Sequence, residues 1–286
     1  MRLETFLFQT GEYGLYLAVL VSFLALLLRK TARGGPAAKG IRFAETLAAI
    51  VSFAVLAVIT VMVVARTVRT GHSPFTSMYE FSVSFVWGIL LVGGLFFLKY
   101  RNLVIQCFVL AIALLLMRYA AALPSASAPL VPALQNNLLL AAHVFSAVIA
   151  YGAFTVGFAA SVLLLVQQNN RFRSLPAKEK LEGISYHSVV IGFPFMTLVI
   201  VLGAIWADVA WGSFWSWDPK ETASLITWLL YAGYLHARVL RKWKGKYSAI
   251  LLIVGFVAVL FTFFGNYLFG GCTRTCKPAR LWRKLN

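Results

Sequence analysis

The chain has 286 residues, of which 60% are hydrophobic and only 12% are charged. A water-soluble domain carries about 25% charged residues, so this composition excludes a soluble globular protein and indicates one polytopic membrane domain. The net charge of +17 does not point to nucleic acid, because the basic residues gather in short loops between apolar runs and no nucleic-acid motif is present.

A bilayer-spanning helix needs about 20 apolar residues, and eight runs meet that length. We therefore predict an all-α integral membrane protein in which residues 1–271 form a single membrane domain. The predicted spans cover residues 11–28, 43–64, 78–98, 103–120, 138–166, 186–207, 221–240 and 248–269.

The distribution of Lys and Arg predicts the orientation of these spans. One set of loops, 29–42, 99–102, 167–185 and 238–247, contains 16 of these residues. The opposite side of the chain up to residue 271 contains 5, which are Arg2, Arg66, Arg69, Arg118 and Lys220, and five more lie in the tail beyond the eighth span. Cytoplasmic loops carry the excess of positive charge, so the richer set is expected in the cytoplasm. Both termini then lie outside, together with loops 65–77, 121–137 and 208–220.

The stretch 203–222 is unusually rich in tryptophan. Four of these residues occur within twelve positions: Trp206, Trp211, Trp215 and Trp217. A single tryptophan at a membrane interface is ordinary, because its ring is amphipathic. Four of them in an external loop, with glycine and acidic residues between, indicate an aromatic surface for a flat, apolar ligand.

The same stretch contains the start of a helix. Asp218 is suited to the N-cap, Pro219 to the first helical position and Glu221 to the reciprocal partner of a capping box. Both carboxylates therefore have a structural explanation, and Asp218 is also a candidate ligand-binding residue. Glu80, near the outer start of the third span, is expected to have an interfacial role.

Two histidines lie inside predicted spans at different depths. His143 lies about 9 Å from the outer end of its span, and His236 lies about 22 Å from the outer end of its own. Ionisable residues inside a membrane are functional candidates, and histidine is a frequent axial ligand of heme iron. From the residues alone, either histidine is also compatible with a satisfied core or interfacial position. His72 is expected in the first external loop and His187 at the cytoplasmic start of the sixth span.

Several separate motifs occur in an order found in one family. They are Gly-His-Ser-Pro at 71–74, Met-Tyr-Glu at 78–80, Pro-Leu-Val-Pro-Ala-Leu-Gln at 129–135, His143, Gly-Phe-Pro at 192–194, Trp-Gly-Ser-Phe-Trp-Ser-Trp-Asp-Pro-Lys-Glu-Thr at 211–222 and Tyr-Leu-His-Ala-Arg at 234–238. The chain thereby resembles heme-handling proteins with a tryptophan-rich "WWD" signature, here over 206–222. The likeness is to cytochrome c biogenesis proteins of the CcsA/ResC type.

The resemblance implies that heme b is the ligand, as cargo or substrate. By the resemblance, His143 is an external ligand of heme iron and His236 a ligand within the membrane. Trp206, Trp211, Trp215, Trp217 and Asp218 would surround the external heme, while His72 belongs to a family motif and is a secondary candidate.

The resemblance also implies a function and partners. The chain would be a membrane subunit that carries heme outward and presents it for covalent attachment to apocytochrome c, in a plasma (inner) or thylakoid-type membrane. Its partners would be a second membrane subunit of the cytochrome c synthase, apocytochrome c, heme and membrane lipid, without nucleic acid. No residue is an evident catalytic acid, base or nucleophile, so enzymatic activity stays open. Two alternatives also stay open: a transporter of another apolar or organic substrate, and an assembly scaffold.

The last fifteen residues depart from the family pattern. Where the family continues Gly-Leu-His-Ser-Tyr and supplies a second external ligand, this chain continues Gly-Cys-Thr-Arg-Thr from Gly271. Codons for Leu-His-Ser-Tyr, read from their second base, give Cys-Thr-Arg-Thr. We therefore predict that a one-base deletion puts 272–286 out of frame; the alternative is a natural basic tail, and resequencing the 3′ end of the gene distinguishes the two.

Overall fold

The computed structural model describes residues 2–31, 37–125, 138–167 and 175–269. These residues form eight helices and no strands, so the predicted all-α class is confirmed. The helices are α1 (Arg2–Thr31), α2 (Ala37–Thr70), α3 (Met78–Tyr100), α4 (Leu103–Ala121), α5 (Leu138–Val166), α6 (Lys178–Trp211), α7 (Pro219–Val239) and α8 (Lys246–Phe269). Residues 272–286, which are predicted to be out of frame, and the motif at 129–135 lie outside the described residues.

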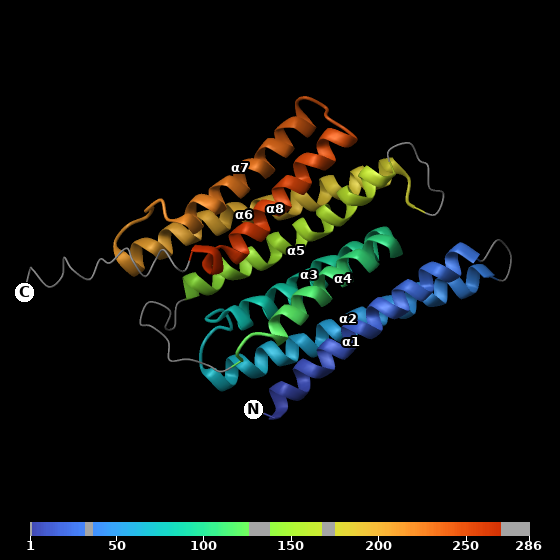
Figure 1. Cartoon of the computed structure of the whole chain (residues 1–286), viewed down its shortest axis with the longest axis horizontal. Coiled ribbons are helices and arrows are strands. Elements are labelled where there is room, and N and C mark those ends of the chain that lie inside the picture. Colours follow the sequence, from blue (N-terminus) through green and yellow to red (C-terminus); the bar gives the residue numbers. More distant parts are fainter. Residues whose placement is uncertain (1, 32–36, 126–137, 168–174, 270–286) are drawn as a thin grey trace, which may run out of the picture.

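Seven of the eight described helices are long and apolar enough to cross a membrane, which makes this a multi-pass membrane protein. The exception is α7, which has sufficient length but is less apolar. It contains Lys220, Glu221, His236 and Arg238 within 21 residues. The prediction of eight apolar spans therefore holds for all helices except this one, which nevertheless lies alongside α6 and α8 (Figure 1).

Three helices extend well beyond the predicted spans of 11–28, 43–64 and 186–207. These are α1, α2 and α6, which are 30 to 34 residues long. An apolar run marks only the part of a helix that crosses the hydrocarbon, whereas a helix continues wherever its polar residues find partners. Arg66 and Arg69 therefore belong to α2 and not to an external loop, because carboxylates of neighbouring helices pair with them.

The helices form two groups of four in chain order, α1–α4 and α5–α8, which lie side by side (Figure 1). The groups meet mainly where α3 crosses α5, and small residues allow this close approach. A Cβ atom built at Gly88 would lie 2.6 Å from the Val148 carbonyl oxygen, and one at Gly152 would lie 2.6 Å from the Gly88 carbonyl oxygen. Both distances are too short for a side chain, so the backbones of α3 and α5 touch directly.

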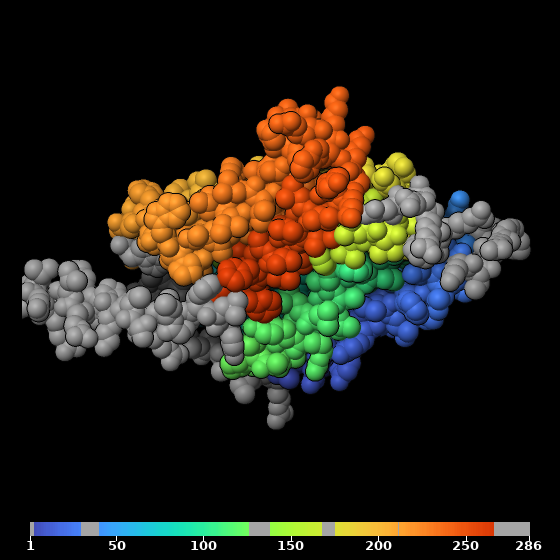
Figure 2. Space-filling model, turned by 45° about the horizontal axis from the view of Figure 1, so that its top comes forward, coloured from blue at the N-terminus to red at the C-terminus, as the bar shows by residue number. Residues whose placement is uncertain are grey.

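A second junction joins the end of α8 to the first group. Figure 2 shows this end of α8, in red, beside the green surface of α4. Tyr119 of α4 and Phe264 of α8 meet edge to face with ring centroids 5.3 Å apart, and Phe85 of α3 meets Phe263 in the same way at 5.1 Å. Aromatic pairs of this kind stabilise the contact between the two groups at the end of the bundle that carries the tryptophan-rich loop.

Candidate functional site

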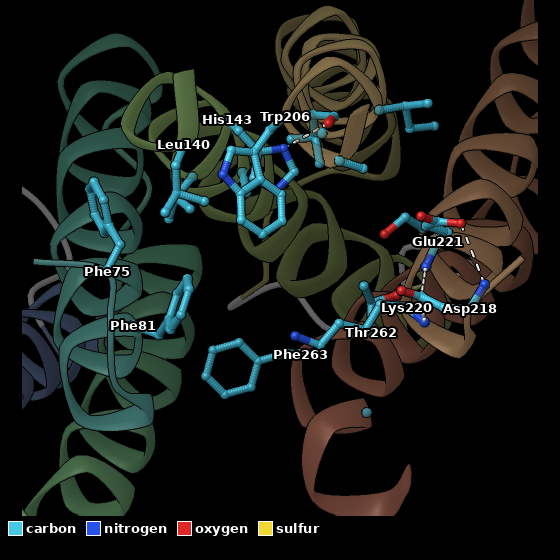
Figure 3. A pocket seen from close by; sticks show the side chains of 18 of the residues that line it. Phe75, Phe81, Leu140, His143, Trp206, Asp218, Lys220, Glu221, Thr262 and Phe263 are labelled. Atoms are coloured by element: carbon cyan, nitrogen blue, oxygen red, sulfur yellow. Dashed lines mark hydrogen bonds between the residues drawn. The ribbon is translucent and has the colours of Figure 1, made fainter. Parts of the chain in front are cut away.

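A cavity of about 570 Å³ lies at the end of the bundle next to the loop between α6 and α7. This volume falls within the roughly 300–1,000 Å³ of typical ligand sites. Residues from both helix groups line it, and most of them are apolar or aromatic; they include Phe75, Phe81, Phe85, Leu140, Tyr151 and Phe263. Figure 3 shows four of these, Phe75, Phe81, Leu140 and Phe263, around the cavity. His143 and a few polar residues of α7 and α8 complete the wall.

His143 of α5 presents a defined face of its imidazole to this cavity. Its Nδ1 atom lies 2.8 Å from the carbonyl oxygen of Val199 in α6. A carbonyl oxygen can only accept a hydrogen bond, so Nδ1 carries the proton and donates it. In the neutral ring, Nε2 then keeps its lone pair. Metal-binding histidines are usually oriented in this way by a second hydrogen bond, which makes Nε2 a suitable ligand atom.

Gly203 of α6 makes room for the His143 ring. A Cβ atom at Gly203 would lie 2.9 Å from Cε1 of His143 and 3.0 Å from its Nδ1. Any residue other than glycine at position 203 would therefore require the His143 ring or the backbone of α6 to move. Sequence reasoning assigned no role to Gly203 or to Val199. The only available signal was that Gly203 opens the tryptophan-rich stretch.

The tryptophans whose side chains the structure describes lie in two different environments. Trp206 and Trp215 line the cavity. Trp217 is 69% exposed and adopts the left-handed conformation, with φ of 59°, and its ring meets the edge of Trp215 at 5.8 Å. Trp211 ends α6, and its side chain is outside the described part of the chain. The structure therefore brings two of the four predicted residues together in the cavity.

One buried polar group of the cavity wall has no hydrogen-bond partner among the described residues. The indole Nε1 of Trp215 is buried, and among the described residues no acceptor lies within hydrogen-bond distance. A buried indole N–H usually finds a partner, because leaving it unpaired costs free energy. This N–H can therefore donate to a polar group of a ligand.

The N-terminus of α7 forms the polar side of the cavity, and its acidic residues are engaged in capping. Asp218 accepts from the backbone N–H groups of Lys220 at 2.7 Å and Glu221 at 2.8 Å. Glu221 in turn accepts from the backbone N–H of Asp218 at 3.4 Å, which completes the capping box, and also from the backbone N–H of Ser216 at 2.7 Å. The structural interpretation of both carboxylates is confirmed, whereas a role of Asp218 in ligand binding stays a prediction.

The capping role predicts different effects for two substitutions of Asp218. Asp218→Ala removes the acceptor and is expected to lower the free energy of unfolding by about 1 kcal/mol, whereas Asp218→Asn keeps an equally good cap and is expected to stay near wild type. Thermal unfolding of the detergent-solubilised protein measures both. Equal losses in the two variants would show that the negative charge, and not the cap, is what Asp218 contributes.

The other histidines lie apart from the cavity. His236 is exposed on α7, as are Ile226 and Leu229, and it is not among the cavity-lining residues. His72 directs Nδ1 to the Ser73 carbonyl oxygen at 2.9 Å, and His187 is exposed on α6. The structure thus places His143 in the cavity wall and none of the other three histidines.

The described residues contain no group of three or more His, Cys, Asp and Glu side chains that could hold a metal ion. A protein site for a bare zinc ion needs three or four such ligands. A single imidazole is sufficient when the remaining positions on the metal are filled by a macrocycle, as in heme. Among the described residues, His143 therefore does not belong to a multi-ligand site for a free metal ion.

The fold and the cavity define a class: a polytopic helical membrane protein with a largely aromatic cavity that contains one imidazole. Residues 11–272 match the family described as "Cytochrome C assembly protein". The chain belongs to this family, which confirms the resemblance inferred from its motifs. Membership supports a role in c-type cytochrome maturation.

Curated relatives agree with this assignment. The cytochrome c biogenesis protein CcsA of Guillardia theta is 36% identical over 246 residues, which are 75% of this chain and 81% of the relative. CcsA of Pyropia yezoensis is 30% identical over 303 residues, covering 89% of this chain and 92% of the relative. CcsA of Chlamydomonas reinhardtii is 36% identical over 224 residues, and the match spans only 63% of that longer relative.

A solved structure has the same fold. The cytochrome c heme lyase CcmF superposes with a TM-score of 0.66 and 20% sequence identity. The match covers 90% of this chain and 46% of CcmF. At this identity the likeness concerns the arrangement of the helices, and this chain corresponds to less than half of the larger protein.

Proposed function

We propose that this protein binds heme b in the cavity next to the α6–α7 loop, as a heme-handling subunit of c-type cytochrome maturation. The observation that carries the proposal is the His143 imidazole, whose Nδ1 is fixed to the Val199 carbonyl oxygen so that Nε2 is left for an iron ion. Heme is the cargo, held by this bond and presented for covalent attachment to apocytochrome c.

The remaining walls of the cavity suit a porphyrin. The rings of Phe81, Phe85 and Phe263 offer apolar faces and edges to the macrocycle. Lys220 and the unpartnered N–H of Trp215 lie on the polar side and can interact with the heme carboxylates. The bond to iron and these polar contacts together would favour one orientation of the ligand.

The absorption spectrum of the purified protein tests this function most directly. After expression in heme-sufficient cells, we expect an intense Soret band. Protein that is folded but shows no Soret band would instead favour a transporter of another organic ligand. Normal cytochrome c levels after replacement of both His143 and His236 would favour an assembly scaffold.

The proposal includes an orientation in the membrane and two macromolecular partners. The excess of Lys and Arg in loops 29–42, 99–102, 167–185 and 238–247 supports a cytoplasmic position for that end of the bundle. The cavity then opens toward the external side of a plasma or thylakoid-type membrane, where apocytochrome c would approach. A second membrane subunit would complete the synthase.

His236 is proposed as an upstream ligand on the path of heme. It lies about 26 Å along α7 from the first residue of that helix, whereas His143 lies about 8 Å along α5, so one heme cannot bridge the two. Its exposed imidazole faces outward from the bundle, which suits a site shared with the second subunit. Heme would bind there before it reaches the outer cavity.

Replacing His236 with alanine is expected to reduce the amount of heme at the outer cavity while His143 remains intact, because the upstream ligand is lost. Heme per protein in the purified variant, measured from the Soret band in the presence of the second subunit, checks this. His187→Ala is the matched control, because His187 is also exposed but lies on α6. Wild-type occupancy in the His236 variant would contradict the two-site path.

A further inference from the structure

One wall of the cavity comes from the loop 71–77 and the first turns of α3. Phe75 and Thr76 of this loop and Met78 of α3 line the cavity. Figure 3 shows Phe75 and Phe81 on the side that faces His143 and Trp206. This wall belongs to the first helix group, whereas His143 belongs to the second, so the width of the cavity depends on how loop 71–77 is held.

A buried carboxylate holds this loop. Glu80 is only 2% exposed, which corrects the interfacial role expected from its position near a helix start. Its Oε2 accepts from the backbone N–H of Thr76 at 2.9 Å and from the Thr76 hydroxyl at 2.6 Å. Its Oε1 accepts from Nε of Arg66 at 2.7 Å. The carboxylate therefore joins loop 71–77 to α2.

Arg66 is itself fixed from several sides. Its guanidinium lies 5.0 Å above the ring of Tyr79, donates to the Ser125 carbonyl oxygen at 3.0 Å and pairs with Glu4 of α1 at 3.5 Å. Glu4 also accepts two hydrogen bonds from Arg69, each 2.6 Å long. Removing one member of such a buried network leaves an uncompensated charge, so the network is rigid while it is complete.

We propose that Glu80 is a positioning residue for the ligand cavity, acting through Thr76. The Met-Tyr-Glu motif then has one task per residue: Met78 lines the cavity, Tyr79 packs against Arg66, and Glu80 connects Arg66 to the loop that carries Phe75. Without the carboxylate, Phe75 would lose its fixed distance from His143. The inference rests on the proposed function insofar as the ligand is heme.

The sharpest test uses Thr76→Val, because this substitution removes one hydroxyl and leaves the Arg66–Glu80 pair intact. We expect a near-wild-type melting temperature, release of heme to an excess of apomyoglobin about fivefold faster, and faster hydrogen exchange of the 71–80 segment in heme-free protein. Glu80→Gln is expected to increase heme release and the hydrogen exchange of the 71–80 segment more strongly than Thr76→Val does. The matched control is Glu12→Gln, since Glu12 is also buried and pairs with Arg118 of α4 away from the cavity.

The control is expected to lower the melting temperature without changing heme release. Wild-type exchange and wild-type heme release in both Thr76→Val and Glu80→Gln would overturn the positioning role. So would equally fast heme release in Glu12→Gln. A wild-type protein that binds no heme would overturn the proposed function alone, and the exchange of the 71–80 segment would still decide whether Glu80 positions this wall.

Discussion

Replacement of His143 with alanine is expected to abolish most heme binding while the protein stays folded. The substitution removes the only imidazole that the described residues bring to the cavity, and with it the bond to iron. Loss of supporting groups around a metal typically costs 10- to 100-fold in affinity, so loss of the ligand itself should cost at least about as much. The Soret absorbance per protein and the yield of mature cytochrome c measure the effect.

Added imidazole provides a control within the same experiment. It should enter the space left by the His143 side chain, coordinate the iron and partly restore the Soret band. His187→Ala, which alters an exposed histidine of α6, should leave the spectrum unchanged. An unchanged Soret band together with unchanged cytochrome c output in the His143 variant would rule out this ligand assignment.

The second large effect is expected for Gly203→Ala, a substitution that leaves every ligand atom in the chain. The new methyl group would lie 2.9 Å from Cε1 of His143 and 3.0 Å from its Nδ1, so we expect the ring to shift and its hydrogen bond to Val199 to be strained. Overpacking of this kind costs about 1–3 kcal/mol, and the displaced Nε2 no longer meets the iron in the same place. We expect heme affinity to fall about tenfold or more.

Two comparisons make this result specific. Gly233→Ala is the matched control, because a Cβ atom at that α7 glycine has no neighbour within 4 Å, and it is expected to be neutral or slightly stabilising. Added imidazole should rescue His143→Ala but not Gly203→Ala, where the displaced ring still occupies the cavity. Normal heme affinity in Gly203→Ala would show that the contact between α5 and α6 does not control the ligand geometry.

Several features followed from local sequence signals. The apolar runs predicted the helices, because each run reflects the length needed to cross a bilayer. The capping box at Asp218 and Glu221 was predicted correctly because all of its hydrogen bonds join residues within one turn. The ordered motifs predicted the family, which the match over residues 11–272 confirms.

Other features depended on partners far away in the chain. Glu80 was expected at an interface, yet it is buried and pairs with Arg66 of α2, which in turn pairs with Glu4 of α1. Likewise the C-terminal end of α2 was predicted at residue 64, although the helix continues to Thr70. The reason is that the carboxylates that pair with Arg66 and Arg69 belong to other helices and cannot be recognised from the local sequence. Trp217 was predicted to share one aromatic surface with Trp206. In the structure, the backbone of Trp217 is left-handed and its ring is exposed.

The sequence by itself determined that the chain is a helical membrane protein, in what order its membrane-spanning segments follow one another and which family it belongs to. The tertiary structure decided which residues share the cavity: His143 meets Val199 and Gly203, more than fifty positions away, while His236 faces outward. The physical reason is that lipid is as apolar as the core, so membrane helices carry no polar stripe that marks their inward face. Only the packing of small residues and buried polar partners selects that face.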